Sequence, residues 1–457
     1  MKLHVKLVLL LAGLSLGPGA AGQQVVHAAP SGTAEGDGSQ ETPVSLLRAV
    51  ELVKPGDRII LAGGEYLLPR RIEIYRSGEP GRPIRMEAAP GATPVLDGRN
   101  IAEGGEWSRS VVSLKADYWH FTGIHFVNGW SGGVTLSGSH NRFDRCVAHH
   151  NGGTGFNVVI GHRKEVNPDG EKGAYNEFYN CDSYMNFDWW TVGGEKRRPG
   201  TNADGFACKL SSGKGNKFYG CRAWSNSDDG WDLFESAFGV VIVNCWAWDT
   251  GIWSDYAEMY RQHTGEELTE ELFDGNGNGF KLGGNHNTGG TACGNLSSGM
   301  NVLRNSIAFG NAVRGIDQNN HGDGVLVEHC LSFDNGTNIG FWRAPNPGKL
   351  FVFRNNIVFG KGGSEPRISV PYVSEGNSWD LGLKGSADQF ESLAREDAMA
   401  PRGEDGSLPV RFGRLVKCSV FIDRGVPSGP VESAKDAMSL PAVPFTGNAP
   451  DLGAYER

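Results

Sequence analysis

The stretch that decides the fold is Asn141-Arg-Phe-Asp-Arg-Cys146, because its pattern recurs along the chain. It returns as Asn176-Glu-Phe-Tyr-Asn-Cys181 and as Asn216-Lys-Phe-Tyr-Gly-Cys221, and looser copies continue as far as residue 356. Each copy alternates hydrophobic and polar residues, as a short β-strand with one buried face does. A single copy cannot bury its hydrophobic face, whereas stacked copies share one core. The repeat therefore predicts an all-β chain folded as a parallel β-helix.

Asparagine and cysteine return at the same places in successive copies. Five residues after the cysteine position stands an asparagine, such as Asn151 or Asn186. We expect these asparagines to adopt a left-handed bend and to bond to the asparagine one coil away. Five of the 8 cysteines hold the repeat's cysteine position: Cys146, Cys181, Cys221, Cys245 and Cys330. Because neighbouring strands lie ~4.8 Å apart, a core stack of small, inward-facing thiols is favoured over disulfides. A bridge between Cys208 and Cys293 stays open.

The two ends of the chain differ from the repeats. Residues 1–22 place two lysines before an apolar run and small residues after it, which predicts a cleaved signal peptide and a secreted protein, periplasmic or extracellular. We expect a linker over 23–40, a β-helix catalytic domain over 41–365, and a tail over 366–457 that folds back along the β-helix and covers its C-terminal end. Residues 45–53 predict a short amphipathic helix that caps the N-terminal end of the coil. No later stretch is long and apolar enough for a membrane span.

The charge balance limits the partners of this chain. Its 43 Lys and Arg stand against 52 Asp and Glu, which gives a formal net charge of −9. This balance argues against a protein that binds nucleic acid or an anionic membrane through charge alone. A chain this acidic that bound an acidic polymer would need a cation or a local basic pocket. We find no oligomer interface in the sequence and expect a monomer.

Aligning the coils brings acidic side chains together on one outer face. Asp204, Asp228, Asp229 and Asp232 fall on two adjacent coils, and Lys281 falls on the next coil beside Asp232. Like charges ~5 Å apart cost about 3 kcal/mol per pair at an intermediate dielectric, so four of them in register favour a bound cation. Oxygen ligands on flexible carboxylates suit Ca²⁺ best. A cation and partial burial both lower the pKa of a lysine, which would make Lys281 available as a base.

Three segments around this cluster resemble the calcium and lysine motifs of polysaccharide lyase family 9. They are Asn202-Ala-Asp-Gly-Phe206, Asp228-Asp-Gly-Trp-Asp232 and Gly277-Asn-Gly-Phe-Lys-Leu-Gly283. The family contains pectate lyases and, in some members, rhamnogalacturonan lyases. The resemblance implies a right-handed coil, Ca²⁺ held by the four aspartates and Lys281 as the base. It also implies β-elimination on an acidic plant cell-wall polysaccharide that contains galacturonate, either homogalacturonan or rhamnogalacturonan I.

Five further residues are weaker candidates for substrate binding. Arg197 and Arg198 stand in an insertion before Asp204, where they are either a solvated charge run or a site for substrate carboxylates. Trp189 is either a platform for a sugar ring or part of the loop packing. Arg314 and Arg343 lie in coils beyond Lys281 and are candidates for contacts with further sugars.

Other functions use the same coil. A glycoside hydrolase of the polygalacturonase type needs two carboxyl groups that flank the glycosidic bond, one of them protonated, and Asp228 with Asp229 imitates such a pair. A non-catalytic carbohydrate-binding β-helix would use the cation site but has no need of Lys281. An epimerase shares the proton abstraction but returns the proton to the sugar.

Overall fold

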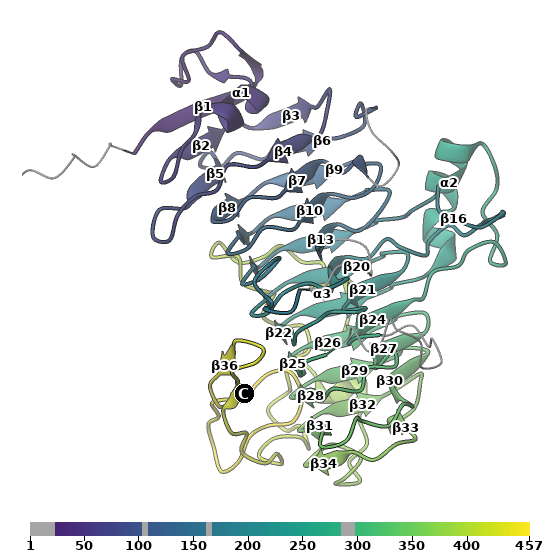
Figure 1. Cartoon of the computed structure of the whole chain (residues 1–457). Coiled ribbons are helices and arrows are strands. Elements are labelled where there is room, and N and C mark those ends of the chain that lie inside the picture. The colour runs from purple at the N-terminus through teal and green to yellow at the C-terminus, as the bar shows by residue number, and fades with distance from the viewer. Residues whose placement is uncertain (1–22, 103–107, 161–166, 285–297) are drawn as a thin grey trace, which may run out of the picture.

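The computed structural model describes residues 23–102, 108–160, 167–284 and 298–457. Its strands form three long sheets that run the length of the molecule, and each turn of the chain adds one strand to each sheet (Figure 1). Neighbouring strands within these three sheets are parallel and in register. The predicted parallel β-helix is confirmed. The signal peptide predicted for residues 1–22 and Cys293 of the open disulfide lie outside the described residues.

The three sheets are called here sheets I, II and III. Sheet I consists of β1 (Val25–Thr33), β2 (Arg58–Leu61), β5 (Ile84–Ala88), β8 (Trp119–Thr122), β11 (Arg142–Asp144), β14 (Glu177–Tyr179), β19 (Lys217–Tyr219), β22 (Val241–Val243), β25 (Asn301–Arg304), β28 (Val325–Glu328), β31 (Phe351–Arg354) and β34 (Val373–Glu375). Sheet II consists of β4 (Ile72–Ile74), β7 (Val112–Leu114), β10 (Val134–Leu136), β13 (Phe156–Val159), β18 (Phe206–Lys209), β21 (Asp229–Asp232), β24 (Asn278–Lys281), β27 (Arg314–Asp317), β30 (Thr337–Phe341) and β33 (Arg367–Ile368). Sheet III consists of β3 (Gly64–Leu67), β6 (Pro94–Asp97), β9 (His125–Val127), β12 (Val147–His149), β15 (Asp182–Tyr184), β20 (Arg222–Trp224), β23 (Trp246–Trp248), β26 (Ile307–Phe309), β29 (Leu331–Phe333) and β32 (Ile357–Phe359).

The remaining elements are short. They are the hairpins β16 (Val192–Gly193) with β17 (Lys196–Arg197) and β35 (Val431–Ser433) with β36 (Met438–Leu440), the helices α1 (Leu46–Leu52), α2 (Ala257–Thr264) and α3 (Arg395–Ala398), and the 3-10 turns η2 (Trp253–Tyr256) and η3 (Ala387–Gln389). In the described part of the chain, no helix has the length and apolar character that a membrane crossing needs.

The core of the coil is built from columns of identical positions. Phe143, Phe178 and Phe218 pair in register in sheet I, and their rings stack at centroid distances of 5.1 and 4.7 Å. The five cysteines of the repeat are buried and free, as predicted. Because each coil places the same residue over its neighbour, the apolar surface that one repeat leaves open is covered by the next.

Asparagine ladders run between the coils. The amide Nδ2 of Asn151 donates to Oδ1 of Asn186 at 3.0 Å, and that of Asn186 donates to Oδ1 of Asn226 at 2.8 Å. This part of the prediction is confirmed. The predicted left-handed bend is wrong by one position, because the positive φ angles belong to the residues before them, His150 (55°) and Met185 (52°). The bend turns the chain, and the asparagine that follows it points inward to bond to the next coil.

At the N-terminal end, half of the stretch predicted as a linker, 23–40, is a strand. Residues 25–33 form β1, which pairs in parallel with β2 and adds the first strand to sheet I. The pairing satisfies backbone groups that would otherwise be left at the open edge of the sheet. The capping helix is confirmed as α1: the Ser45 hydroxyl accepts the N–H of Arg48, and Leu46 and Ala49 are buried against the core.

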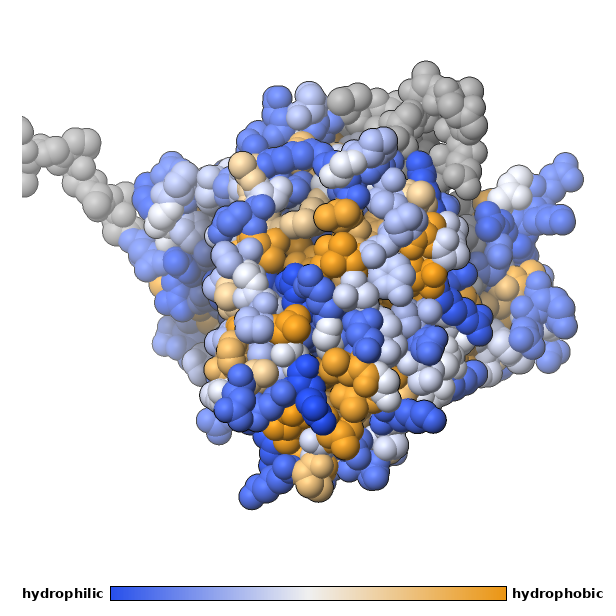
Figure 2. All heavy atoms as spheres, turned by 90° about the horizontal axis from the view of Figure 1, so that it is seen from below, coloured by the Kyte–Doolittle hydropathy of each residue, from blue (hydrophilic) through white to orange (hydrophobic). Residues whose placement is uncertain are grey.

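At the C-terminal end, the coil continues past the predicted boundary at residue 365, since β33 and β34 add strands to sheets II and I. Trp379 packs against the end of the core. The rest of the tail returns along the outside of the coil (Figure 1): Phe412 packs against Trp246 and Phe309, each with ring centroids 5.0 Å apart. Seen from below, the C-terminal end carries separate hydrophobic patches divided by hydrophilic side chains (Figure 2).

Candidate metal and proton-transfer site

The site lies on the outer face of sheet II, where β18, β21, β24 and β27 are neighbours. The register pairs Ala207 with Asp232, Asp232 with Lys281, and Lys281 with Asp317. Successive residues of a strand point to opposite faces, so these four side chains form one outward column. The alignment of coils made from the sequence is therefore confirmed at this place.

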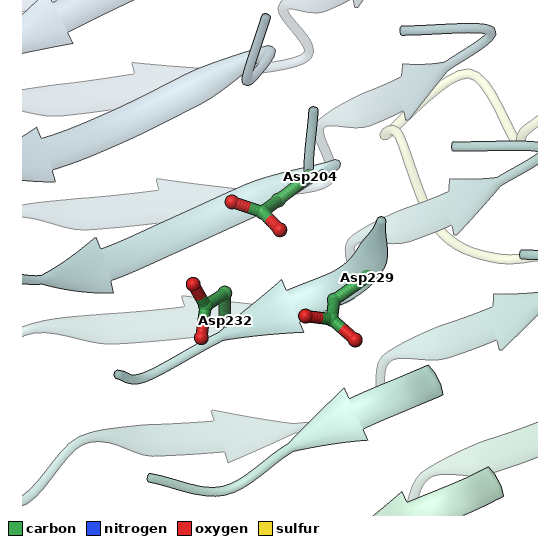
Figure 3. A group of neighbouring side chains, drawn as sticks. All are labelled: Asp204, Asp229 and Asp232. Atoms are coloured by element: carbon green, nitrogen blue, oxygen red, sulfur yellow. The ribbon is translucent and has the colours of Figure 1, made fainter. Parts of the chain in front are cut away.

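Three carboxylates converge across two adjacent coils. Asp204, Asp229 and Asp232 each offer an oxygen, and these oxygens lie within 4.8 Å of one another (Figure 3). All three side chains are buried although they stand on the outer face. The fourth predicted ligand, Asp228, is also buried, and its Oδ1 accepts the backbone N–H of Asn276 at 2.8 Å. The structure therefore brings Asp204, Asp229 and Asp232 together. Asp228 precedes Asp229 in the chain but is not one of the three converging carboxylates.

Two lysines face these carboxylates. Nζ of Lys281 lies 2.9 Å from Oδ2 of Asp229 and 3.4 Å from Oδ1 of Asp232. Nζ of Lys209 lies 2.7 Å from Oδ2 of Asp204 and 3.0 Å from Oδ2 of Asp232. Asp232 thus stands between two ammonium groups, each of which also holds a second carboxylate.

Lys209 was not predicted as a site residue, although its place in the strand pattern could have indicated it. It stands two residues after Ala207 on β18, and residues two apart on a strand share a face. The column that we aligned contained Ala207, and the next outward position of the same strand belongs to the site. The long side chain of Lys209 reaches back to Asp204, and only 13% of that side chain is exposed.

The donor set fits a hard divalent cation. Oδ1 of Asp204 is buried and has no hydrogen-bond partner among the described residues, and the same holds for Oδ1 of Asn278. Nδ2 of Asn278 donates to Oδ1 of Asp229 at 2.8 Å, which places that amide in the cluster. Buried oxygens without a donor are costly unless something else satisfies them. Four carboxylates against two ammonium groups also leave a formal excess of two negative charges, which a divalent ion would cancel.

The pKa values show the strain among the carboxylates. Burial, with the neighbouring Asp232 and Asp229, raises the pKa of Asp204 to about 7 against the opposing effect of Lys209. Burial likewise raises the pKa of Asp229 to about 6 against the effect of Lys281. Burial also acts to raise the pKa of Asp232, but Lys281 and Lys209 outweigh it and lower that pKa. The cluster therefore favours partial protonation unless more positive charge enters it.

Lys281 carries the opposite shift. Burial by itself lowers its pKa, but Asp229 and Asp232 outweigh burial and raise the pKa well above its usual value. The lowering that we expected from burial and a cation is thus not produced by the protein's own side chains. With the carboxylates alone around it, Lys281 is an ammonium group that helps to neutralise them.

Two of the weaker candidates, Arg197 and Arg198, are already paired with acidic side chains. Nη1 of Arg197 on β17 contacts Oε2 of Glu266 at 2.7 Å. Arg198 forms an ion pair with Asp274. Both arginine side chains are about half exposed, and they tie the hairpin β16–β17 to the segment that follows α2.

Trp189 is part of the loop packing, which was the alternative to a sugar platform. It is only 5% exposed, and its ring stacks on His263 with centroids 3.6 Å apart. The ring of Trp130 meets it edge-on at 5.4 Å. A ring covered in this way offers no face to a sugar, so the prediction of substrate stacking is wrong for Trp189.

Arg314 and Arg343 stand on coils beyond Lys281. Arg314 opens β27, pairs in register with Asn278, and lies 3.7 Å from Oδ1 of Asp317. Arg343 follows β30, and its Nη1 donates to the backbone carbonyl of Asn320 at 3.0 Å. Of the two, Arg314 belongs to the outer face that carries the carboxylates.

Comparisons with known proteins agree with this geometry. A family model described as "Pel9A-like, right handed beta helix region" matches residues 26–356. Pectate lyase L of Dickeya dadantii (strain 3937) is 35% identical over 448 residues, which cover 95% of this chain and 91% of that protein. Pectate lyase PEL9 of Emericella nidulans is 28% identical over 411 residues, covering 84% of this chain and 90% of that protein.

Solved structures show the same likeness. The crystal structure of pectate lyase Pel9A is 34% identical, with a TM-score of 0.76 over 96% of this chain and 98% of that one. A rhamnogalacturonan lyase is 24% identical, with a TM-score of 0.70 over 86% of this chain and 97% of that one, and at this identity the likeness concerns the fold alone. The coil is accordingly right-handed, as the resemblance implied.

Proposed function

Because the chain belongs to polysaccharide lyase family 9 and is a polysaccharide lyase, we propose that it cleaves a galacturonate-containing pectic polymer by calcium-dependent β-elimination outside the cell. The membership sets aside the hydrolase and the non-catalytic binder that the sequence left open. The relatives with at least 30% identity are named pectate lyases, so homogalacturonan is the first substrate to test.

The observation that carries the proposal is the meeting of three buried carboxylates and Lys281 on one open face. Nζ of Lys281 lies 2.9 Å from a carboxylate of that cluster. Elimination on a uronate needs positive charge at the substrate carboxylate and a base beside the carbon next to it. A cation among the carboxylates would supply the positive charge, and Lys281 would supply the base. Asp229 and Asp232 hold Lys281 in place, and its side chain is only 8% exposed.

The proposed ligands of Ca²⁺ are Asp204, Asp228, Asp229 and Asp232. A calcium ion there would supply positive charge that ties the substrate carboxylate to the protein and stabilises the charge developing on it. Asp204, with one oxygen unpaired, is the ligand that the protein's own donors satisfy least. Lys209 holds Asp204 and Asp232 together and so orients two of the four ligands.

Lys281 takes the proton in this proposal. Its neutral amine removes the hydrogen from C5 of the galacturonate, the electron pair of that C–H bond forms the C4–C5 double bond, and the C4–O bond breaks. The leaving oxygen receives a proton from water. Asp229 and Asp232 hold the ammonium form of Lys281 while their charges are uncompensated, so neutralising those charges is what releases the amine for the reaction.

The test is ultraviolet absorbance followed over time on polygalacturonate and on rhamnogalacturonan, each with added Ca²⁺ and with a chelator. We expect absorbance from the unsaturated product end on polygalacturonate with Ca²⁺ and none with chelator. Absorbance on rhamnogalacturonan alone would move the substrate to that polymer. Reducing ends that form without absorbance would contradict the elimination, and full activity in chelator would contradict the role of calcium.

A further inference from the structure

A second feature of the outer face of sheet II lies toward the C-terminal end of the coil. It is a pocket of about 450 Å³. Arg314, Gly340, Trp342 and Arg367 are among the residues that line it. The lining carries two arginines and an exposed tryptophan but no acidic side chain, in contrast to the carboxylate cluster on the same sheet.

The pocket and the cluster share one column of outward positions. Lys281 pairs in register with Asp317, Asp317 with Gly340, and Gly340 with Arg367. The strands β24, β27, β30 and β33 follow one another down the coil (Figure 1). Three steps between neighbouring strands make ~14 Å, so Arg367 stands about that far along the sheet from Lys281. A pyranoside residue is about as long as one step, which corresponds to roughly three sugars.

Arg314 is held in place across this pocket. Its guanidinium lies over the ring of Trp342, 4.7 Å from the centroid. A Cβ atom on Gly340 would stand 2.9 Å from Cδ of Arg314, so the glycine leaves the space through which the arginine crosses the strand. Trp342 is itself fixed, because its Nε1 donates to Oδ1 of Asn320 and its backbone N–H donates to Oε1 of Gln318, both at 2.9 Å.

Arg367 adds a second guanidinium on the next strand. It is exposed, and within residues 298–457 no carboxylate lies at ion-pair distance from it. A guanidinium presents N–H groups in a planar fork that matches a carboxylate, and aromatic surface beside it suits the apolar face of a sugar ring. Trp342, at 39% exposed, provides such a surface.

We infer that Arg314, Trp342 and Arg367 form a distal subsite that binds the carboxylate of a uronate about three sugars away from the bond that is cleaved. The inference rests on the proposed function, since it places the same polymer along the column from Lys281 to Arg367. It assigns the acidic end of the face to the reaction and the basic end to holding the chain. The subsite would favour long, unesterified polymers over short ones.

The test compares Arg367→Ala and Trp342→Ala with the unchanged enzyme on galacturonate oligomers of three and of at least six residues. We expect the KM for the long oligomer to rise about tenfold in each variant, far more than for the trimer, with kcat little changed. Added salt should reduce the difference in KM for the long oligomer between Arg367→Ala and the unchanged enzyme, because the contact that Arg367 makes is ionic. Arg411→Ala, an exposed arginine of the tail, is the matched control and should behave as the unchanged enzyme.

Binding of the uncleaved long oligomer to Lys281→Ala, with and without Arg367→Ala, separates the two proposals. Weaker binding in the double variant supports the subsite. Equal binding, or equal losses on the short and the long oligomer, would overturn it while leaving the lyase proposal intact. An unchanged enzyme that neither binds nor cleaves the oligomers would overturn both.

Discussion

The outer faces of sheets II and III both carry columns of side chains that repeat from coil to coil, but the two columns differ in chemistry. On sheet III the outward column is aromatic: Tyr184, Trp224 and Trp248 stack at centroid distances of 4.3 and 4.8 Å, and phenylalanines continue the column. On sheet II the corresponding column holds Asp232 and Lys281. The tail packs against much of the first column, whereas the second is buried among its own charged side chains.

The difference teaches what repetition does to each kind of side chain. Identical rings one strand apart attract, and burying an aromatic ring contributes several kcal/mol through the area removed from water. Identical charges one strand apart repel, so a charged column persists only with opposite charges between its members, as Lys209 and Lys281 provide. Sheet III therefore stabilises the coil, whereas sheet II stores a charge imbalance that is useful for chemistry.

The largest expected effect of a substitution on the charged column of sheet II is the loss of activity on replacing Lys281. Lys281→Ala should lower kcat by about 10²–10⁴-fold, the usual contribution of a general base, while the fold stays intact. Calcium binding, measured by calorimetry, should not weaken, because the variant leaves more negative charge in the cluster. Lys361→Ala, an exposed lysine after β32, is the control. Turnover that survives in Lys281→Ala would rule out the lysine as the base.

On sheet III the corresponding change acts on stability. Phe412 is fully buried between Trp246 and Phe309, and Phe412→Ala should lower the free energy of unfolding by about 3–5 kcal/mol. We expect a lower Tm in calorimetry and an unchanged kcat at low temperature, since Phe412 belongs to the cluster on sheet III and not to the carboxylate site. Val410→Ala removes a residue that is 71% exposed in the same segment and should change neither quantity. A loss of kcat in Phe412→Ala at full folding would show that the two faces are coupled.

The smallest expected effect is on the pH dependence of stability, through the buried carboxylate of Asp204. In chelator, stability should fall as the pH rises from about 4 to about 7. The reason is that Asp204 in the unfolded chain releases its proton near the ordinary aspartate pKa of 3.8, whereas the folded chain keeps that proton until about pH 7. Asp204→Asn cannot ionise there, so its unfolding free energy above pH 7 should exceed that of the unchanged protein, on the order of 2 kcal/mol.

The same variant should bind Ca²⁺ at least about tenfold more weakly, about 1.4 kcal/mol, since one charged ligand is lost. Chemical unfolding across the pH range and calcium titration by calorimetry measure both quantities. A parallel pH dependence in Asp204→Asn and the unchanged protein would show that Asp204 is not the strained carboxylate.

The coil and the position of Lys281 beside Asp232 were predictable because, in a β-helix, equivalent positions of successive repeats lie next to each other. Once the repeat is aligned, each strand lies directly under its equivalent, and Asp232 pairs with Lys281 across a gap of 49 residues in the chain. The insertions have no such rule. Trp189 and Arg197 lie in the insertion between β15 and β18, where packing against α2 and the residues after it decides their contacts.

The N-terminal strand β1 escaped the sequence analysis for a related reason. Residues 25–33 do not carry the repeat, and their pairing with β2 depends on the open edge of sheet I rather than on their own pattern. Lys209 is the reverse case: its face was implied by the alternation of β18, but its two ion pairs depend on the path of a long side chain.

By itself, the sequence determined the repeat, the stacked core and which residues share a column, because a fixed step between coils makes these properties local. Only the tertiary structure decided which column is covered and how the charges pair. The docking of the tail on sheet III, the ion pair of Lys209 with Asp232 and that of Lys281 with Asp229 join residues distant in the chain. Such contacts depend on shape, burial and the sum of nearby charges, which no single repeat contains.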